Sequence, residues 1–450
     1  MKTVNQDSSA KRTAIVIGGG LVGSLCTCLL AERGYKVTLY EKRPDIRKLT
    51  IAKGRSINLA LSHRGRKGLK LVGVEEQVLK NAIPMIGRFL HRKDGFTVSV
   101  PYDPVSSQCI YSVGRNLLNQ ILLDVAERSK SVSLCFEHKL VNVDFNTDII
   151  TIQKNGWEDL IKTTADFIVG ADGAFSSLRA FMQKTPLFNF SQNFVDHGYL
   201  ELSIPPEKSD NMINNHLHIW PRGDFMMIAL PNRDKSWTVT LFMPFKNFDA
   251  ITNAEELLSF FKTTFPDAIP LMGEDTLKDF YFKTPPQSLV SIKCSQYHLG
   301  KKFMIIGDAA HAIVPFYGQG MNAGFEDCTV LNEILNETDD DIQKSIVLFT
   351  ERRRGDAFAI SDLALYNYKE MRDLVTKPSY QARKVIDTYL AKIWPKFWVP
   401  LYNSVSFSHM GYRQCVENRK WQNKMLIVGL SLAIAIAILM SLVLRILANK

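Results

Sequence analysis

Few cysteines, no internal repeat and no apolar segment near its beginning characterise this chain of 450 residues. Its seven cysteines are odd in number and dispersed, which is typical of free thiols in a reducing compartment and not of a disulfide framework. The first residues, MKTVNQDSSAKRT, contain no apolar run, so we expect no signal peptide. Cys26 and Cys28 form a C-x-C pair, but a helix would turn their side chains about 200° apart. We therefore predict packing there and no metal site.

Basic residues outnumber acidic ones, with 55 Lys and Arg against 45 Asp and Glu. They are scattered along the chain, and no zinc-finger, recognition-helix or RNA-binding sheet pattern accompanies them. The excess indicates a basic surface suited to anionic membranes or phosphorylated cofactors, and no nucleic-acid partner is predicted. The length and the 46% content of hydrophobic residues predict two closely packed domains.

One apolar run is long enough to cross a bilayer. The stretch MLIVGLSLAIAIAILMSLVL, residues 425–444, contains no charge and is bracketed by basic residues, and as a helix it would span about 30 Å. A buried core helix rarely runs so long without a polar residue, so we predict a transmembrane tail anchor. Because little chain follows it, the rest of the protein is expected on the cytosolic side of the membrane.

A second apolar stretch precedes the anchor. The sequence AKIWPKFWVPLYNSVSF carries Lys392, Lys396 and two prolines, which makes it a poor spanning helix. Two readings stay open for residues 385–408, because this segment could lie at a membrane surface or pack as an ordinary C-terminal helix.

A dinucleotide-binding pattern follows the first apolar stretch of the chain. Gly18, Gly20 and Gly23 satisfy G-x-G-x-x-G directly after a predicted strand, which allows a tight turn, close approach to a pyrophosphate and close helix–strand packing. Glu41 closes the next strand, 18 residues beyond the last glycine. A carboxylate there can accept both hydroxyls of an adenosine ribose and would repel a 2′-phosphate, which favours FAD or NAD over NADP as the bound cofactor.

Two further motifs separate these cofactors. FIVGADGAFSSLR (residues 167–179) places Asp172 at a strand end, and FMIIGDAAH places Asp308 at another. Together with the glycine motif they resemble the flavoprotein aromatic hydroxylases, which are single-component FAD monooxygenases. The resemblance implies that Asp308 holds the ribityl chain of FAD. It also implies that a helix beginning near Gly320, Met321 and Asn322 directs N–H groups and a positive dipole end toward the flavin.

The same resemblance implies the reaction. Since the chain has one dinucleotide fingerprint, NADPH is expected to visit the flavin transiently, and O2 then yields a C4a-hydroperoxyflavin that hydroxylates an aromatic ring. The flavin carries this chemistry, so no catalytic side chain is predicted. His311 lies three residues after Asp308, and we expect a structural hydrogen bond for it rather than acid–base catalysis.

Longer stretches, among them LHIWPR (217–222), FMMIALPN (225–232) and AISDLALYNYKEMR (359–372), resemble an animal branch of this family. That resemblance implies an aromatic amino acid as the small-molecule substrate and a place in the mitochondrial outer membrane. It assigns substrate binding, including a grip on the substrate carboxylate, to Arg88, Tyr102, Asn367 and Tyr402. The residues predicted to contact FAD are Gly18, Gly20, Val22, Gly23, Tyr40, Glu41, Lys42, Arg43, Ala60, Arg115, Leu140, Asp172, Ser176, Asp308, Gly320, Met321 and Asn322.

The predicted fold is α/β: a Rossmann-like FAD-binding domain with an inserted antiparallel β-sheet substrate domain, a helical C-terminal region and a transmembrane helix. The predicted boundaries are 10–85, 108–184 and 291–340 for the FAD-binding domain, 86–107 and 185–290 for the substrate domain, 341–420 for the helical region over the pocket, and 425–444 for the anchor.

Two alternative functions stay open. One is another tail-anchored FAD monooxygenase of the squalene epoxidase type, whose substrate would be an apolar lipid. The other is a non-catalytic flavin-containing module that is tethered to a membrane and recruits partners. No oligomeric state is predicted.

Overall fold

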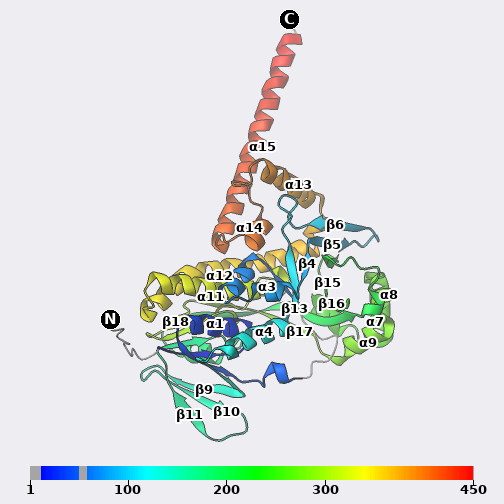
Figure 1. Ribbon diagram of the computed structural model, residues 1–450. Helices are drawn as coiled ribbons and strands as arrows, with labels where there is room; N and C mark the ends of the chain where they lie inside the picture. Colours follow the sequence, from blue (N-terminus) through cyan, green and yellow to red (C-terminus); the bar gives the residue numbers. More distant parts are fainter. Residues whose placement is uncertain (1–11, 50–57, 449–450) are drawn as a thin grey trace, which may run out of the picture.

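A six-stranded sheet lies at the centre of the nucleotide-binding half of the protein. The structure, a computed structural model shown in Figure 1, describes residues 12–49 and 58–448, so part of the predicted 10–85 segment lies outside the described residues. The strand order is β18-β19-β12-β1-β2-β8, and all neighbours are parallel except β18. The strands are β1 (Thr13–Ile17), β2 (Lys36–Glu41), β8 (Val132–Phe136), β12 (Phe167–Gly170), β18 (His298–Leu299) and β19 (Phe303–Ile305).

The strand order creates a switch point beside β1. The chain leaves β1 through helix α1 (Leu21–Glu32) to reach β2 on one side, whereas β12 pairs with β1 on the other side. A parallel strand that is covered on both faces has a continuous apolar sequence. Residues 14–17 of β1, AIVI, are accordingly all buried. Helices α4 (Arg115–Arg128) and α11 (Gly320–Glu337) pack against α1. The predicted order of strand, glycine turn, helix and strand is confirmed, and ligands of such sheets bind where the strand order diverges.

A seven-stranded sheet forms the second half. Its order is β17-β13-β16-β15-β14-β5-β6, with one parallel pair, β14 and β5. It therefore combines strands from the two segments that the sequence assigns to an inserted β-sheet, and β17 extends beyond residue 290; the domain boundaries themselves stay predictions. The strands are β5 (Gly87–His91), β6 (Thr97–Pro101), β13 (Phe190–Ile204), β14 (His216–Pro221), β15 (Met226–Pro231), β16 (Trp237–Pro244) and β17 (Gln287–Cys294).

Both faces of this sheet carry buried apolar side chains. Successive residues of a strand point to opposite faces, so neighbouring residues belong to different clusters. Trp220 and Met227 face a cluster with α7 (Ala254–Thr264), α8 (Ala268–Met272) and α9 (Glu274–Lys283). Their neighbours Ile219 and Met226 face a different cluster, which includes residues of the long helix α12 (Ile342–Arg372). The second face thus joins the sheet to the C-terminal helices.

Two small sheets complete the β-structure. Strands β9 (His138–Asp144), β10 (Ile149–Lys154) and β11 (Leu160–Thr163) form an antiparallel sheet that lies at the end of the molecule opposite the C-terminus (Figure 1). Strands β3 (Asn58–Leu61), β4 (Ile83–Met85) and β7 (Ile110–Gly114) form another between the halves, and helix α2 (His63–Leu71) follows β3.

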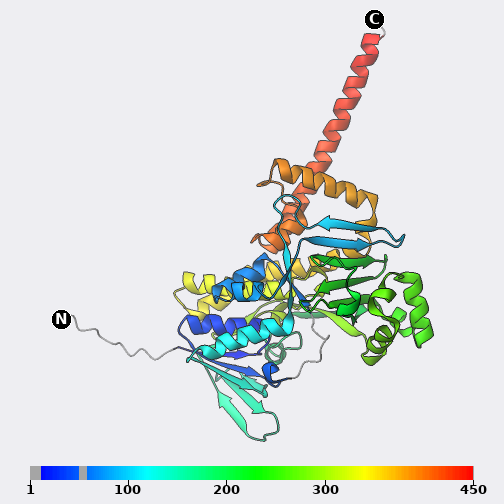
Figure 2. The same cartoon turned by 45° about the vertical axis from the view of Figure 1, so that its right-hand side comes forward.

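The C-terminal region is helical and ends in a protruding helix. It consists of α12, α13 (Pro378–Ile393), α14 (Leu401–Phe407) and α15 (Tyr412–Ala448). Helix α15 begins well before the apolar run, because its first turns pack through Tyr412 and Cys415, whereas no part of its most apolar stretch is buried. By length and composition it is a candidate membrane span, and Figure 2 shows it standing clear of the rest of the molecule.

Candidate active site

The glycine motif forms a tight cradle after β1. Gly18 has a φ of +106°, and a Cβ there would lie 2.5 Å from the carbonyl oxygen of Ala171, which follows β12. A Cβ on Gly23 would lie 1.9 Å from the carbonyl oxygen of Gly18, so only glycine lets α1 pack this closely. No atom lies within 4 Å of a Cβ on Gly20 among the described residues. The backbone at Gly20 is therefore open to a ligand.

Glu41 stands beside this cradle at the end of β2. Its Oε2 accepts a hydrogen bond from the Gly19 N–H at 2.7 Å, and its Oε1 pairs with the Arg43 guanidinium at 2.9 Å. Burial raises the pKa of the Glu41 carboxyl, but Arg43 and the backbone N–H groups outweigh this and hold it below its usual value. The carboxylate is therefore ionised and adjacent to the glycine turn. Of the flanking predicted residues, Tyr40 is buried and Lys42 is exposed.

The second motif is joined to the third by an arginine. Asp172 accepts the Ser177 N–H at 2.6 Å through Oδ2, at the start of α5 (Ser177–Met182), while its buried Oδ1 has no partner among the described residues. Ser176 caps the same helix by accepting the Arg179 N–H. The Arg179 guanidinium donates to the carbonyl of Ala309 at 2.8 Å, directly after Asp308. The two motifs are thereby fixed next to each other.

In the third motif, α10 (Asp308–His311) is followed by a turn and by α11. The Asp308 side chain is exposed to solvent, although many protein atoms lie around its carboxyl group. These atoms partly desolvate the carboxyl and raise its pKa, whereas the Arg115 guanidinium lowers it. Asn322 donates to the carbonyls of Ala60 at 2.8 Å and of Gly318 at 2.7 Å, which fixes the first turn of α11.

The first three N–H groups of α11, those of residues 320–322, have no hydrogen-bond partner in the part of the chain that the structure describes. A helix end with free N–H groups carries partial positive charge, so an anionic or electron-rich ring is stabilised there. Leu140 lies buried in β9, within the core beneath the first sheet.

His311 faces inward. Its Nε2 lies 2.6 Å from Oδ2 of Asp327 on α11, and both side chains are buried. The same carboxylate accepts the Gly307 N–H at 2.8 Å and binds Arg353 of α12 at 2.8 Å. Burial raises the pKa of Asp327, but His311 and Arg353 outweigh it and the pKa is lowered. His311 thus contacts a buried network of charged side chains, and its structural role stays a prediction.

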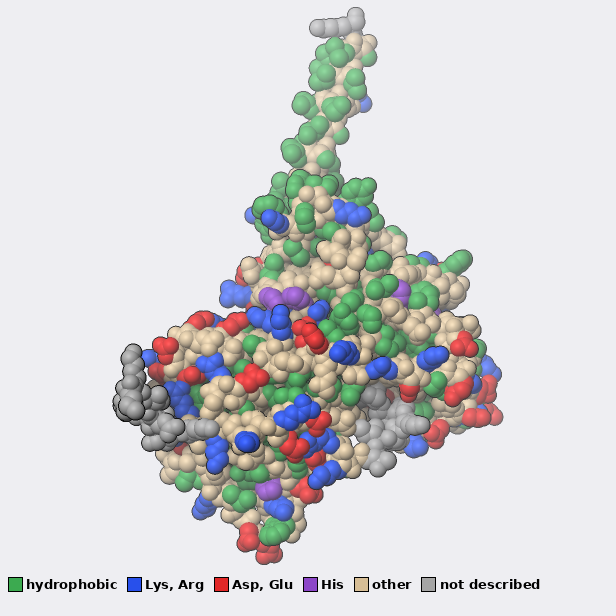
Figure 3. All heavy atoms as spheres, viewed as in Figure 1, with side chains coloured by type: hydrophobic (Ala, Val, Ile, Leu, Met, Phe, Trp, Pro, Cys, Tyr) green, Lys and Arg blue, Asp and Glu red, His purple; other side chains and the backbone are tan. Residues whose placement is uncertain are grey.

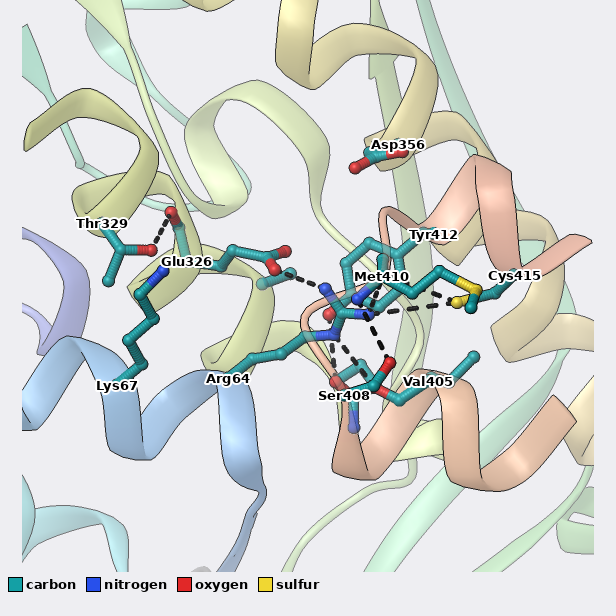
Figure 4. Close-up of polar contacts among 12 residues, drawn as sticks. Arg64, Lys67, Glu326, Thr329, Asp356, Val405, Ser408, Met410, Tyr412 and Cys415 are labelled. Atoms are coloured by element: carbon teal, nitrogen blue, oxygen red, sulfur yellow. Dashed lines mark hydrogen bonds and ion pairs between the residues drawn. The ribbon is translucent and has the colours of Figure 1, made fainter. Parts of the chain in front are cut away.

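The network continues to the C-terminal segment through Arg64 on α2. Glu326, next to Asp327, pairs with Arg353 at 2.9 Å and with Arg64. Figure 4 shows the Arg64 guanidinium directed into the turn between α14 and α15. It donates there to the carbonyls of Val405 at 2.9 Å and of Met410, and it stacks over the Tyr412 ring. One arginine therefore holds the segment that precedes the protruding helix.

A cavity of about 290 Å³ lies between the β-sheet half and the C-terminal helices. It is lined from β6 and the loop after it, from α12, from α13 and from the segment around α14. Arg88, Tyr102 and Tyr402 line it, and Asn367 contacts Arg88 from α12. Predicted residues from two distant parts of the sequence, 88–102 and 367–402, are therefore brought together around Arg88.

Arg88 is the charged centre of this cavity. Its guanidinium lies 4.5 Å from the Tyr402 ring and 5.9 Å from the Tyr102 ring, and these two rings stack at 5.3 Å. Its Nη1 donates to Glu370 at 3.0 Å, while its buried Nε has no partner among the described residues. The cavity is thus bordered by a cation, one of whose buried donors has no partner among the described residues, and by phenol rings.

Sequence reasoning missed Glu370 and the ion network. Glu370 lies three residues after Asn367, so both project from the same face of α12, and this spacing could have identified it. Arg64 and Glu326 carried no such signal, because a basic run and an acidic pair on helices ordinarily indicate a solvated surface.

Comparisons with known proteins place the chain in a family. The sequence profile of a family described as FAD binding domain matches residues 11–341. The chain is 54% identical over 428 residues to the kynurenine 3-monooxygenase of Anopheles gambiae, covering 94% of this chain and 88% of the relative. It is 44% identical over 422 residues to that of Sus scrofa, covering 93% and 89%.

Solved structures show the same fold at low identity. The tetrameric form of 2-methyl-3-hydroxypyridine-5-carboxylic acid oxygenase superposes with a TM-score of 0.67 at 19% identity, covering 88% of this chain and 96% of that chain. The p-nitrophenol 4-monooxygenase PnpA from Pseudomonas putida gives 0.68 at 17% identity, covering 90% and 98%.

We predict that Arg64→Met loosens the C-terminal segment. Breaking one side of a buried ion network costs about 3–5 kcal/mol, so limited proteolysis should cut within residues 394–411 and the melting temperature should fall. Arg66→Met is the matched control, because Arg66 lies on the same helix and its partner Glu75 is only half-buried. Equal protease resistance of the two variants would contradict this role for Arg64.

Proposed function

Because the chain belongs to the kynurenine 3-monooxygenase family and carries its FAD-binding domain, we propose that it hydroxylates L-kynurenine to 3-hydroxykynurenine with NADPH and O2. An FAD-dependent monooxygenase activity follows from the family. The observation that supports the amino acid substrate is Arg88, a buried cation with a free Nε at a cavity lined by tyrosines.

The cavity suits the two charges of an amino acid. Arg88 offers N–H donors to the substrate carboxylate, which a guanidinium binds in a bidentate manner. Tyr102, Asn367 and Tyr402 surround Arg88 and complete the proposed carboxylate site. Glu370, 3.0 Å from Arg88, supplies the opposite charge for the substrate ammonium group. An apolar lipid has no use for this pair, which disfavours a squalene epoxidase type of reaction.

The residues of the cradle fit FAD. Gly18, Gly20 and Gly23 would hold the pyrophosphate, and Glu41 would accept the ribose hydroxyls. Asp308 would hold the ribityl chain. The remaining contacts predicted from the sequence are proposed for the same role. Bound FAD supplies the oxygen-transfer chemistry.

The N–H groups at the start of α11 would stabilise negative charge on the flavin ring, because they combine free donors with the positive end of a helix dipole. The lining of the cavity by Tyr102, Tyr402 and Phe407 would keep water from the ring that is hydroxylated. Kynurenine carries an aniline nitrogen next to the position attacked, and its lone pair activates the ring. A dedicated general base is therefore unnecessary, which accords with the inward orientation of His311.

The membrane assignment has a supported and a proposed part. Helix α15 supports anchoring in a membrane. We infer that this membrane is the mitochondrial outer membrane and that the catalytic part faces the cytosol, because the chain resembles an animal branch of the family with this location. The domain boundaries given above are proposed on the same footing.

The function is tested by purifying the full chain in detergent, recording its visible spectrum and identifying the product formed with NADPH and air. We expect a flavin spectrum, kynurenine-stimulated NADPH oxidation and 3-hydroxykynurenine as the product, with no stimulation by squalene. A yellow protein whose oxygen uptake no substrate stimulates would instead support the non-catalytic alternative.

We predict that Arg88→Ala weakens kynurenine binding by about 10- to 150-fold, since a hydrogen bond to a charged group is worth about 1.5–3 kcal/mol, while flavin content stays unchanged. Arg92→Ala is the control, because Arg92 belongs to the same hairpin, is about half exposed and pairs with Asp94. Titration by flavin fluorescence measures both. A colourless Arg88→Ala protein would show that Arg88 serves cofactor binding or folding instead.

For His311→Ala we expect a turnover number per bound flavin within about fivefold of the parent, whereas loss of a general base costs about 10²–10⁴-fold. The melting temperature should fall, because Asp327 loses one of its buried partners. Steady-state kinetics across pH, normalised to flavin, make the measurement. A drop of two orders of magnitude that His311→Asn does not restore would identify His311 as catalytic.

A further inference from the structure

Helix α13 presents an exposed apolar stripe to solvent. Six large apolar side chains of α13 and the turn after it are 43 to 75% exposed, and we call them the α13 face: Val385, Ile386, Tyr389, Ile393, Trp394 and Phe397. At 3.6 residues per turn the four helical members fall within a sector of about 100°. Asp387 and Ala391, on the opposite side, are buried. A soluble surface rarely carries so concentrated an apolar patch without a partner.

The position of the α13 face identifies the partner. Arg383 of α13 donates to Asn423 of α15 at 2.7 Å, and Arg419 of α15 donates to Asp387 of α13 at 2.8 Å. After α13, the carbonyl of Val399 accepts from Gln422 at 2.7 Å. Helix α13 is therefore fixed to α15 at residues 419–423, directly below the apolar run that starts at residue 425.

The views agree with these contacts. In Figures 1 and 2, α13 lies across the base of the protruding part of α15. Figure 3 shows apolar side chains gathered around that base with basic side chains beside them. The basic residues at this level include Lys392, Lys396, Lys420 and Lys424, which are exposed. Aromatic rings with flanking lysines are typical of segments that lie at a membrane–water interface.

We propose that the α13 face is a membrane-docking surface, which lies in the interface of the same bilayer that α15 crosses. The prolines and lysines of the surrounding segment keep it from spanning the membrane, whereas the α13 face buries into the headgroup boundary and the neighbouring lysines favour anionic lipids. This inference rests on α15 as the anchor and not on the identity of the substrate. The opposite face of α13 lines the cavity through Lys384, Thr388 and Ala391. The bilayer therefore supports the outer side of a cavity wall.

The test uses the full chain in vesicles that contain anionic lipids with brominated acyl chains, which quench indole fluorescence on contact. We compare the parent with Trp394→Phe and Trp157→Phe. The two tryptophans are matched, with exposures of 55% and 56%, but Trp157 lies in the β10–β11 connection, far from α15 (Figure 1). We expect bromine-dependent quenching to fall in Trp394→Phe and to stay unchanged in Trp157→Phe. Transfer from detergent to unbrominated vesicles should also lower acrylamide quenching of Trp394.

Three results would overturn the inference. The first is equal bromine quenching in the parent and Trp394→Phe. The second is a lipid-independent dimer that shields Trp394, which would assign the α13 face to a second copy of the chain. The third is failure of the protein to float with vesicles, which would remove α15 as the anchor. Kynurenine turnover in the same vesicles tests the proposed function separately, and the flavin spectrum confirms that each variant is folded.

Discussion

The arrangement of this protein depends on burying two adjacent carboxylates, Glu326 and Asp327, in the middle of α11. Buried charges are tolerated only with partners, and removal of one partner is far costlier than the pair is stabilising. The partners come from three other elements: Arg64 from α2, His311 from α10 and Arg353 from α12. Helix α11 can therefore dock in one register only. The direction of its N-terminus, which would face the flavin, is therefore set by Glu326 and Asp327, about two turns further along the helix.

The parts that were predictable from the sequence are those whose information is local. Gly18, Gly20 and Gly23 act through the backbone of one turn, and Glu41 lies where the following strand must end, so spacing alone identifies them. The inserted antiparallel sheet was likewise predicted, because alternating apolar residues in stretches such as SWTVTLFMPF are a local pattern. The start of α15 was not predictable from hydropathy, because its first turns are held by packing of Tyr412 and Cys415 rather than by an apolar run.

The residues around the cavity, in contrast, could not be predicted from local sequence patterns. Arg88 lies in β5, and its partner Glu370 is 282 residues away on α12. Taken alone, Arg88 reads as a surface cation, and only resemblance to a known family singled it out. Arg64 was not singled out at all, since a basic run at the start of a helix ordinarily faces water. Arg64 is buried because the tertiary fold brings carbonyl groups of the C-terminal segment close enough to accept its hydrogen bonds. Such residues acquire their roles from the tertiary fold and leave no pattern in the chain.

The C-terminal region contributes both to the cavity and to the contacts that hold the cofactor-binding motifs in place. Tyr402 of the cavity sits on α14, between α13 and α15, and Arg64 holds the turn that follows it. One face of α13 lines the cavity, and the other is the α13 face below the apolar part of α15. Because the network from Arg64 to Asp327 also fixes Gly307 beside Asp308, the glycine cradle, the cavity wall and the C-terminal helices share one set of buried charges. A displacement of the C-terminal helices would therefore act on both sites, since each contact in this path joins rigid elements.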